Sequence, residues 1–452
     1  MQVPRAGINW TDVRAEATEL LREYIRIDTT NPPGGEEAGA LFLRDALAKD
    51  GVAARLHDAG NARVSLSARL PATHPDGGKP IVLLSHIDVV PAEPDHWSVD
   101  PFAGELRDGV LWGRGTLDMK GMGIMELLVL LLAKRHDVPL TRDILFVAVA
   151  DEEEGGRKGM HFLCETAPEL LDAAWVLNEG AYGFCEFLGQ SVKLFSLGPS
   201  EKSPCWLKLR ARGQPGHASV PHTDNAVVRL VRALGRIEAR EQRARLTAPV
   251  EAMFRTLRKR GVIPEAFDPK DPGILDMLAS ADAHLGAITR DTINLTGMRA
   301  GHKHNVIPAT AEATLDCRLL PDTDPDRFVE DVRALIDDPT VEIERVLVHD
   351  SGQSSLDTPL AKVVAEVIAA RYGDEAAVLP ILSPGFTDSH AYRAAGAQAY
   401  GFVPVLLTRD DLATIHGHDE RISVDNLMLG TEVLFDVVTK LAGPTNHAQA
   451  SR

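Results

Sequence analysis

The chain has few cysteines, and they form no pattern of a disulfide framework or a structural zinc site. Only four occur in 452 residues: Cys164, Cys185, Cys205 and Cys317. No two of them are spaced as a CxxC pair. Scattered cysteines of this kind are typical of free thiols in a reducing compartment. We therefore expect all four thiols to be free.

The sequence also lacks any apolar run near the roughly 18 residues that a membrane-spanning helix needs. Its opening segment, MQVPRAGINWTDVRAEATELL, contains no basic stretch followed by an apolar one, so no secretory signal peptide is predicted. Basic residues are outnumbered by acidic ones, 48 to 65, which gives a net charge of −17. That charge argues against nucleic acid or a membrane as a partner. These absences predict a cytoplasmic protein.

Length and hydropathy patterning predict two domains of α/β character. A chain of 452 residues exceeds one ordinary domain, and its 44% apolar and 25% charged residues are typical of globular proteins. Helical patterns at 10–25, 38–50 and 122–134 alternate with apolar runs at 80–89 and 144–150. This rhythm predicts a mostly parallel sheet that is covered by helices.

The hydropathy pattern changes near residue 200. The segment CWLKLRAR at 205–212 alternates apolar and polar residues, as a half-exposed strand does. The α/β pattern resumes at about residue 316. We therefore predict a larger domain of residues 1–199 and 316–442, an inserted two-layer α+β domain of residues 200–315, and a tail of residues 443–452 outside the fold.

Histidine and carboxylate side chains follow the apolar runs of the larger domain. The segment LLSHIDVVPA contains His86 and Asp88, GTLDMKG contains Asp118, and ADEEEGG contains Glu152 and Glu153. Because the carboxyl ends of parallel strands meet at one edge of a sheet, these side chains are expected to lie together. Imidazole and carboxylate are ligands that zinc takes, and a carboxylate can bridge two ions. The sequence therefore predicts a site for two metal ions.

Together these motifs resemble the M20 family of metallopeptidases, which includes aminoacylase-1, succinyl-diaminopimelate desuccinylase and glutamate carboxypeptidase. The resemblance extends from DTTNPPG at 28–34 to HGHDE at 416–420. It implies a dinuclear catalytic domain interrupted by a lid domain that often dimerises, so a homodimer is expected. The implied cofactors are two divalent ions, in the first place Zn²⁺, with Co²⁺ or Mn²⁺ as alternatives.

The resemblance also implies roles for individual residues. Five side chains are the implied metal ligands: His86, Asp118, Glu153, Glu179 and His416. Three more are implied in catalysis: Glu152, Asp88 and His217. Asp118 would bridge the ions, Asp88 would hold the ring of His86, and Glu152 would act as general base on a metal-bound water. His418 competes with His416 for the last ligand position, and the spacing to the following glutamate favours His416.

The predicted inserted domain contributes a histidine in GQPGHASVPH. In the family this histidine reaches an active site, in dimers that of the neighbouring subunit, so His217 is expected to stabilise an oxyanion. Asn305 in NVIP and Arg318 in DCRLLP are candidate substrate contacts, because an arginine can grip a carboxylate with two nitrogen atoms. Many relatives carry an arginine directly after a Thr-Asp-x segment. This chain has His390 in that place, as a third candidate contact.

The expected reaction is hydrolysis of an amide or peptide bond next to a free carboxylate in a small peptide, as in a dipeptidase or carboxypeptidase. The alternative is an aminoacylase-type reaction, in which the substrate is an N-acyl amino acid. A remote alternative is a non-catalytic binding protein on the same scaffold, although no ligand or base of the family is missing. A serine hydrolase is disfavoured because the chain has no G-x-S-x-G segment.

Overall fold

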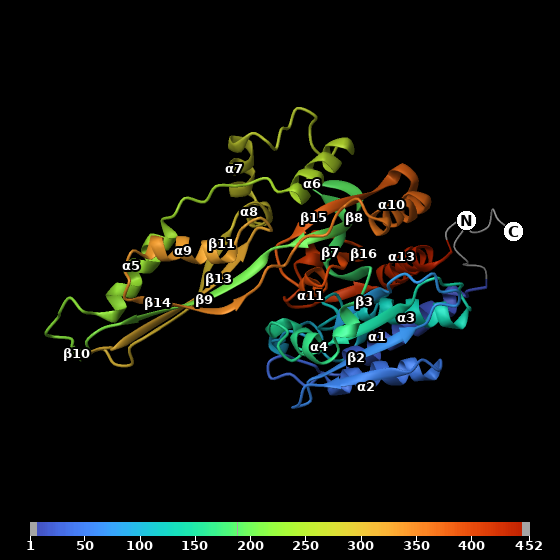
Figure 1. Ribbon diagram of the computed structural model, residues 1–452, viewed down its shortest axis with the longest axis horizontal. Coiled ribbons are helices and arrows are strands. Elements are labelled where there is room, and N and C mark those ends of the chain that lie inside the picture. Colours follow the sequence, from blue (N-terminus) through green and yellow to red (C-terminus); the bar gives the residue numbers. More distant parts are fainter. Residues whose placement is uncertain (1–6, 188, 445–452) are drawn as a thin grey trace.

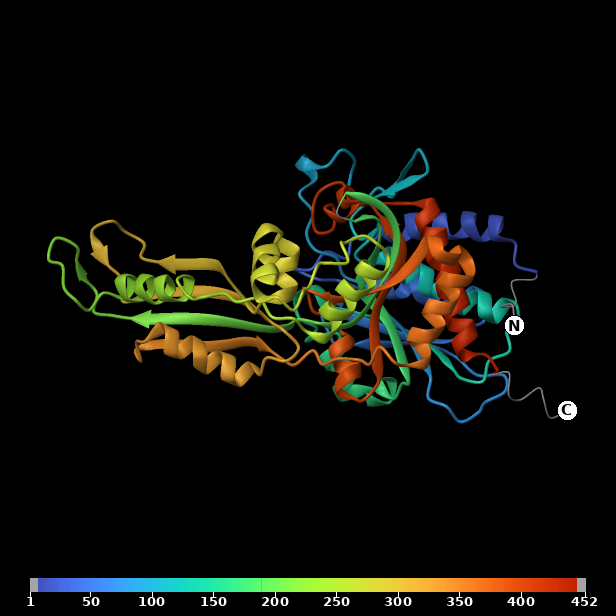
Figure 2. The same cartoon turned by 90° about the horizontal axis from the view of Figure 1, so that it is seen from above.

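The computed structural model describes residues 7–187 and 189–444 and has two lobes, a broad one and an elongated one (Figures 1 and 2). The broad lobe is built on an eight-stranded sheet with the order β1-β2-β6-β3-β7-β16-β8-β15. The elongated lobe is built on a four-stranded sheet with the order β11-β13-β9-β14. The predicted α/β architecture with a second, smaller unit is therefore confirmed.

The sheet of the broad lobe is mixed and mostly parallel, as the sequence predicts. β3 pairs in parallel with β6 and β7, β16 with β7, and β15 with β8. β1 and β6 pair with β2 in antiparallel fashion, and β8 pairs with β16 in the same way. The strands are β1 (Ala54–Asp58), β2 (Val64–Leu70), β3 (Ile81–His86), β6 (Ile144–Val149), β7 (Trp175–Phe187), β8 (Gln190–Glu201), β15 (Ala376–Ser383) and β16 (Gln398–Leu407).

The central strands are buried on both faces, which explains their unbroken apolar runs. Along β3, Ile81 and Leu83 face one hydrophobic cluster, whereas Val82 and Leu84 face another. The helices of the first cluster are α1 (Trp10–Ile25), α2 (Glu37–Lys49), α3 (Lys120–Arg135), α10 (Pro359–Tyr372) and α13 (Val424–Ala442). The second cluster includes α4 (Met160–Thr166) and α11 (Ser389–Ala394). Because helices cover both faces, polar side chains from these strands gather at the edge of the sheet.

The elongated lobe has two layers, a sheet and two helices. Its strands are β9 (Ser203–Arg212), β11 (Thr292–Ala300), β13 (Thr310–Leu319) and β14 (Val341–Val348). The helices α5 (Ala226–Glu238) and α9 (Pro325–Ile336) pack on this sheet in a separate core. A two-stranded sheet of β10 (Gly216–His217) and β12 (Val306–Ile307) lies at the far end of the lobe (Figures 1 and 2).

The elongated lobe ends later in the chain than the sequence predicts. The expected boundary between residues 315 and 316 falls inside β13, and β14 continues the same sheet to Val348. A helix followed by a strand, here α9 and β14, has the same hydropathy rhythm in either lobe. That rhythm therefore cannot indicate which sheet a strand joins.

Three helices from the predicted inserted range pack on the broad lobe instead. They are α6 (Ala248–Lys259), α7 (Pro272–Ala281) and α8 (Ala283–Thr289). Met253 of α6 and Ile288 of α8 share a hydrophobic cluster with Leu379 of β15. This segment thereby forms a wall beside the carboxyl ends of the sheet strands.

The remaining elements are short. They are η1 (Pro94–His96), β4 (Glu105–Arg107), β5 (Val110–Trp112), η2 (Glu152–Glu154), η3 (Pro168–Leu171), η4 (Gly373–Glu375), α12 (Arg409–Leu412) and β17 (Arg421–Ser423). All four cysteines are free thiols, as expected. Within the described ranges, no helix is long and apolar enough to cross a membrane. Residues 445–452 of the predicted tail lie outside the described residues.

Candidate metal centre

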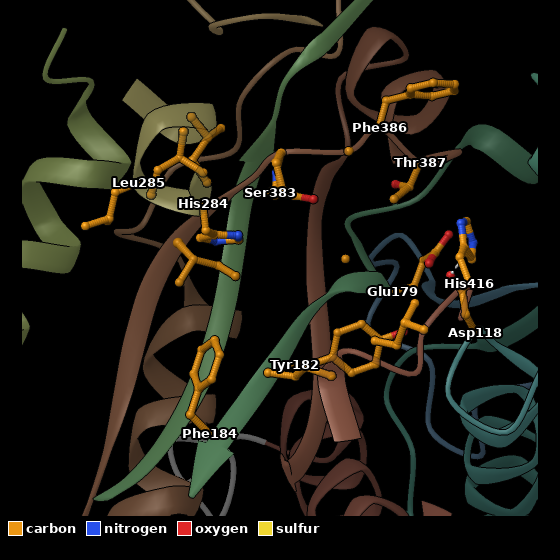
Figure 3. A pocket seen from close by; sticks show the side chains of 18 of the residues that line it. Asp118, Glu179, Tyr182, Phe184, His284, Leu285, Ser383, Phe386, Thr387 and His416 are labelled. Atoms are coloured by element: carbon orange, nitrogen blue, oxygen red, sulfur yellow. Dashed lines mark ion pairs between the residues drawn. The ribbon is translucent and has the colours of Figure 1, made fainter. Parts of the chain in front are cut away.

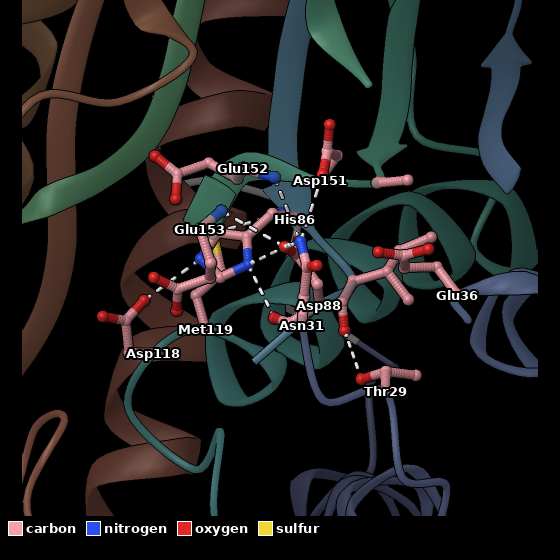
Figure 4. A network of polar contacts seen from close by, with 12 residues as sticks. Thr29, Asn31, Glu36, His86, Asp88, Asp118, Met119, Asp151, Glu152 and Glu153 are labelled. Carbon is pink, nitrogen blue, oxygen red and sulfur yellow. Dashed lines mark hydrogen bonds and ion pairs between the residues drawn. The ribbon is translucent and has the colours of Figure 1, made fainter. Parts of the chain in front are cut away.

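Two histidines and three carboxylates converge at one edge of the large sheet, with Asp118 between the histidines (Figures 3 and 4). Nε2 of His86 lies 3.1 Å from one Asp118 oxygen, and Nε2 of His416 lies 3.1 Å from the other. His86 is also 3.6 Å from Glu179 Oε1, and His416 is 3.4 Å from Glu153 Oε1. Each histidine therefore has its own glutamate, and both share Asp118, which is an arrangement suited to two bridged ions.

The cluster has the donors and the charge that a divalent cation requires. Ligand atoms of His86, Asp118 and Glu153 lie within 4.8 Å of one another, and so do those of His86, Glu152 and Glu179. Oε1 of Glu153 is buried without a hydrogen-bond partner. Buried carboxylates so close together are costly unless a positive charge compensates them. The residues therefore fit a metal site.

The electrostatics of the cluster follow from burial and mutual contact. Burial raises the pKa of Glu153 and Glu179, and the neighbouring Asp118 raises both further. The contact of His416 with Asp118 raises the pKa of its imidazole to about 10. Although burial opposes it, hydrogen bonds from both histidines hold the pKa of Asp118 well below its usual range. The cluster thus stabilises positive charge in its centre.

Asp88 shapes the centre through the main chain as well as through the histidine ring (Figure 4). Nδ1 of His86 donates to the main-chain oxygen of Asp88 at 2.9 Å, and the Asp88 carboxylate is farther away, at 3.6 Å. This bond fixes the ring so that Nε2 faces Asp118. The carboxylate of Asp88 instead accepts the N–H groups of Glu152 at 3.2 Å and Glu153 at 3.1 Å.

The turn before the two glutamates is held by a buried ion pair. Asp151 has a left-handed backbone with φ of 67°, and its carboxylate is paired with the Arg63 guanidinium. Glu152 and Glu153 follow in η2 and diverge: Glu153 extends toward Asp118, whereas Glu152 groups with His86 and Glu179 (Figure 4). Both carboxylates reach the same cavity.

Glu420 holds the loop that carries Asp118, a role that the sequence did not reveal. Its Oε1 accepts the N–H groups of Leu117 at 2.7 Å and Asp118 at 3.1 Å. Its Oε2 accepts from Arg114 Nη1 at 2.7 Å, and the carboxylate is fully buried. The one indication in the sequence is that Glu420 is the glutamate of the HGHDE segment, whose spacing favours His416 over His418 as the ligand. His418 of that segment turns away, toward Glu93 at 3.1 Å.

His217 and Asn305 lie far from this centre in the same chain. His217 is in β10, opposite Val306 of β12, at the tip of the elongated lobe (Figures 1 and 2). The main-chain oxygen of Asn305 accepts the N–H of Ala218 at 3.1 Å, so both predicted residues share the tip. Nδ1 of His217 accepts the N–H of Ser219 at 3.2 Å, which leaves the proton of the neutral ring on Nε2.

The two other predicted substrate contacts behave differently. Arg318 lines the cavity, where its guanidinium lies 4.7 Å from the Phe386 ring and donates to Asp316 at 2.7 Å. His390 does not belong to the cavity wall. It stacks on His349 with 3.9 Å between ring centroids, and its Nδ1 donates to the Thr387 oxygen at 3.0 Å. His390 is the second residue of the short helix α11, which begins at Ser389.

A cavity of about 910 Å³ opens from the carboxylate cluster toward α8 (Figure 3). Asp118, Glu152, Glu153, Glu179 and His416 line one end. Most other lining side chains are apolar: Tyr182, Phe184, Phe187, Trp206, Met253, Leu285, Ile288, Leu379, Ile381, Leu382, Phe386, Leu412 and Ile415. The sequence did not reveal this wall, because its residues come from six separate segments and each one reads as ordinary core.

This fold and this site define the class of protein, a metal-dependent hydrolase of amide or peptide bonds. Residues 82–440 match the model of peptidase family M20/M25/M40. The chain belongs to this family.

Several known proteins are similar to the chain. It is 30% identical over 433 residues to aminoacylase-1 of Sus scrofa, and the match covers 94% of each chain. It is 34% identical over 367 residues to N-fatty-acyl-amino acid synthase/hydrolase PM20D1 of Xenopus tropicalis, which covers 77% of this chain and 70% of that one. An M20 family metallo-carboxypeptidase from Sulfolobus solfataricus has a similar fold, with a TM-score of 0.73 at 20% identity, over 94% of this chain and 99% of that one.

Proposed function

We propose that the protein hydrolyses the amide bond of N-acyl amino acids. The observation that carries this proposal is the cavity, which joins the carboxylate cluster to a long apolar wall. The carboxylate cluster can hold the metal ions that hydrolysis of a small amide needs, and the apolar wall fits an acyl group. Similarity to aminoacylase-1 over 94% of both chains and to a relative named for N-fatty-acyl-amino acids supports the same substrate class.

The proposed cofactors are two divalent ions, in the first place Zn²⁺. The proposed ligands are His86, Glu179, Asp118, Glu153 and His416, with Asp118 shared by both ions. Imidazole and carboxylate suit Zn²⁺, and also Co²⁺ or Mn²⁺. When bound, such ions polarise a substrate carbonyl and make water a better nucleophile.

Glu152 is the proposed general base. Its carboxylate lines the cavity and groups with His86 and Glu179. In this position it can take a proton from the attacking water and deliver it to the amide nitrogen, which leaves as the amine of the amino acid. Burial raises the pKa of Glu152, and the nearby Glu179 raises it further, so the carboxylate holds a proton readily.

Arg318 is the proposed contact of the substrate carboxylate. Its guanidinium lines the cavity beside Phe386 and is held by Asp316 through Nε and Nη2. The remaining nitrogen, Nη1, is the donor that we assign to the substrate. A guanidinium fixed in this way loses little side-chain entropy when a carboxylate binds.

His217 is proposed to act in a homodimer. It lies at the tip of the elongated lobe, so we infer that it serves the centre of the partner subunit, where its Nε2–H would stabilise the oxyanion of the tetrahedral intermediate. Asn305 at the same tip would enter the partner's site with it. The single chain supports this proposal because its own centre contains neither residue.

A dipeptidase is the second candidate, and the cavity favours it less. A dipeptide would bring a charged ammonium group, which needs a carboxylate outside the metal centre. Asp282 and Glu186 also line the cavity. The first caps α8 by accepting the Leu285 N–H at 2.9 Å, and the second accepts the Arg409 N–H at 3.1 Å. Both carboxylates therefore have main-chain partners.

A hydrolysis screen tests the proposal. N-acyl amino acids and matched dipeptides should be compared with protein loaded with Zn²⁺, Co²⁺ or Mn²⁺, and Glu152→Gln protein should serve as the blank. We expect N-acyl amino acids to be cleaved with a higher kcat/KM than the matched dipeptides. A consistent preference for dipeptides would contradict the proposal and favour the second candidate.

A further inference from the structure

Part of the cavity beside the metal centre is an apolar arm. It is lined by apolar side chains that the hydrophobic core covers only in part. Twelve buried residues from α6–α8, β8, β15 and the segments beside them form one cluster, and the cavity borders it. Phe184, Phe187, Leu285 and Ile381 pack against this cluster, are only half-buried, and line the cavity. Their exposed surface therefore faces the cavity. An apolar surface at this place is expected to bind an apolar group.

Helix α8 forms the end of this arm. Leu285 and Ile288 are three residues apart and therefore lie on one face of the helix, and both line the cavity. Figure 3 shows Leu285 and His284 on α8 at one side, Phe184 below, and Asp118, Glu179 and His416 on the opposite side. A group that leaves the metal centre along this arm meets α8.

The charged side chains that line the cavity outside the metal centre, besides Arg318, are Asp282, Glu186 and Arg409. The carboxylate of Asp282 is used as the cap of α8, and Glu186 and Arg409 are exposed at the surface. The half-buried side chains that pack against the core are apolar, so each methylene that is buried against them adds to binding.

We propose that this arm binds the acyl group of the substrate as an unbranched aliphatic chain of several carbon atoms, and that Leu285 determines how long that chain is. The inference rests on the proposed function. Arg318 beside Phe386 takes the amino-acid carboxylate on a different wall, so the arm is left for the other half of the substrate. Each methylene that enters the arm should raise kcat/KM by about fourfold, until the chain reaches α8.

The test is a chain-length series with the wild-type protein, Leu285→Trp and Leu285→Ala. Derivatives of one amino acid with acyl groups from acetyl to dodecanoyl are compared in kcat/KM, each below its micelle concentration. We expect wild-type kcat/KM to rise with length. Leu285→Trp should lower kcat/KM for the longest chains at least about tenfold more than for the N-acetyl substrate, whereas Leu285→Ala should shift the optimum to longer chains.

A matched control separates the effect of a larger side chain from the effect of its position in the arm. Met277→Trp adds an indole to the neighbouring helix α7, at a side chain that is 62% exposed and outside the cavity. It should leave the length profile unchanged. Circular dichroism and metal analysis show whether each variant is folded and holds its metals.

The outcomes separate this inference from the proposed function. Hydrolysis of all N-acyl amino acids without dependence on chain length would overturn the inference and leave the function standing. Loss of the same factor for every length in Leu285→Trp would overturn it as well. If the variant instead changes preference among amino-acid side chains at a fixed acyl group, the arm binds the other half of the substrate and the inference is wrong. Absence of all N-acyl hydrolysis would overturn the proposed function itself.

Discussion

Two adjacent glutamates in this centre have different partners because of one neighbouring aspartate. Asp88 accepts the main-chain N–H groups of both Glu152 and Glu153, which fixes the short helix on which they stand. Glu153 then faces Asp118 and His416, and Glu152 faces the opening between His86 and Glu179. A change in one glutamate should therefore affect chemistry, and a change in the other should affect metal binding.

Glu152→Gln tests this division at the level of one proton. The amide keeps the shape of the side chain but cannot accept a proton, so turnover should fall by about 10²–10⁴-fold while metal content stays the same. Glu153→Gln is the matched variant and should lose metal. Metal loss in Glu152→Gln with retention in Glu153→Gln would show that the two roles are exchanged.

At this scale the sequence predicts residue types better than it predicts their neighbours. His86 and Glu153 were identifiable because they stand at or after strand ends, and Asp118 because it stands after a glycine-rich turn. The structure brings all three together. The place of His390 was assigned by position alone, and the prediction that it contacts substrate lacks support from the cavity, because its ring stacks on His349. Stacking depends on residues 41 positions apart in the chain, which no local pattern reveals.

At the scale of the elements, the two lobes are connected where β8 is followed by β9. Two consecutive residues at this connection, Glu201 and Lys202, face opposite ways. Glu201 ends β8 and pairs with Arg393 at 2.6 Å in the broad lobe. The next residue, Lys202, donates to the Arg290 oxygen at 2.8 Å and to Thr292 at 2.9 Å, at the start of β11. The alternation of an extended chain explains this division.

Lys202 gives the stability of this junction a dependence on pH. Burial lowers the pKa of its amine to about 7, whereas the unfolded chain has a value of about 10.4. Between these values the unfolded state binds more protons, so raising the pH favours the folded state. We expect the difference in Tm, wild type minus Lys202→Met, to increase as the pH rises from about 7 to about 9.5. The exposed Lys134→Met variant is the control, and a constant difference for Lys202→Met would contradict the expectation.

The elements themselves were largely predictable, and their assignment to sheets was not. The unbroken apolar runs of β3 and β6 predict buried parallel strands, and both strands lie in the sheet centre. The register that joins β13 and β14 to β9 depends on pairing between residues 98 to 143 positions apart. Hydropathy describes which face of a strand is buried, but not which partner covers it.

For the whole molecule, the position of His217 predicts that one chain is not a complete enzyme. His217→Ala should retain its metals and lose about 10²–10³-fold in turnover, the usual cost of one oxyanion donor. Mixing that chain with Glu152→Gln should restore activity, because each mixed dimer has one site with an intact base and an intact histidine. Proven subunit exchange without rescue would contradict sharing between subunits.

The proposed role of Asp118, which would serve two ions from its place between His86 and His416, is central to the account, and the metal content of the purified chain tests it most directly. Elemental analysis of metal-loaded wild-type protein should find close to two equivalents per chain. Asp118→Ala should lose both ions together, because one carboxylate serves both positions, while its circular dichroism shows that it remains folded. Two tightly bound ions in folded Asp118→Ala protein, or a single equivalent in the wild type, would contradict the account.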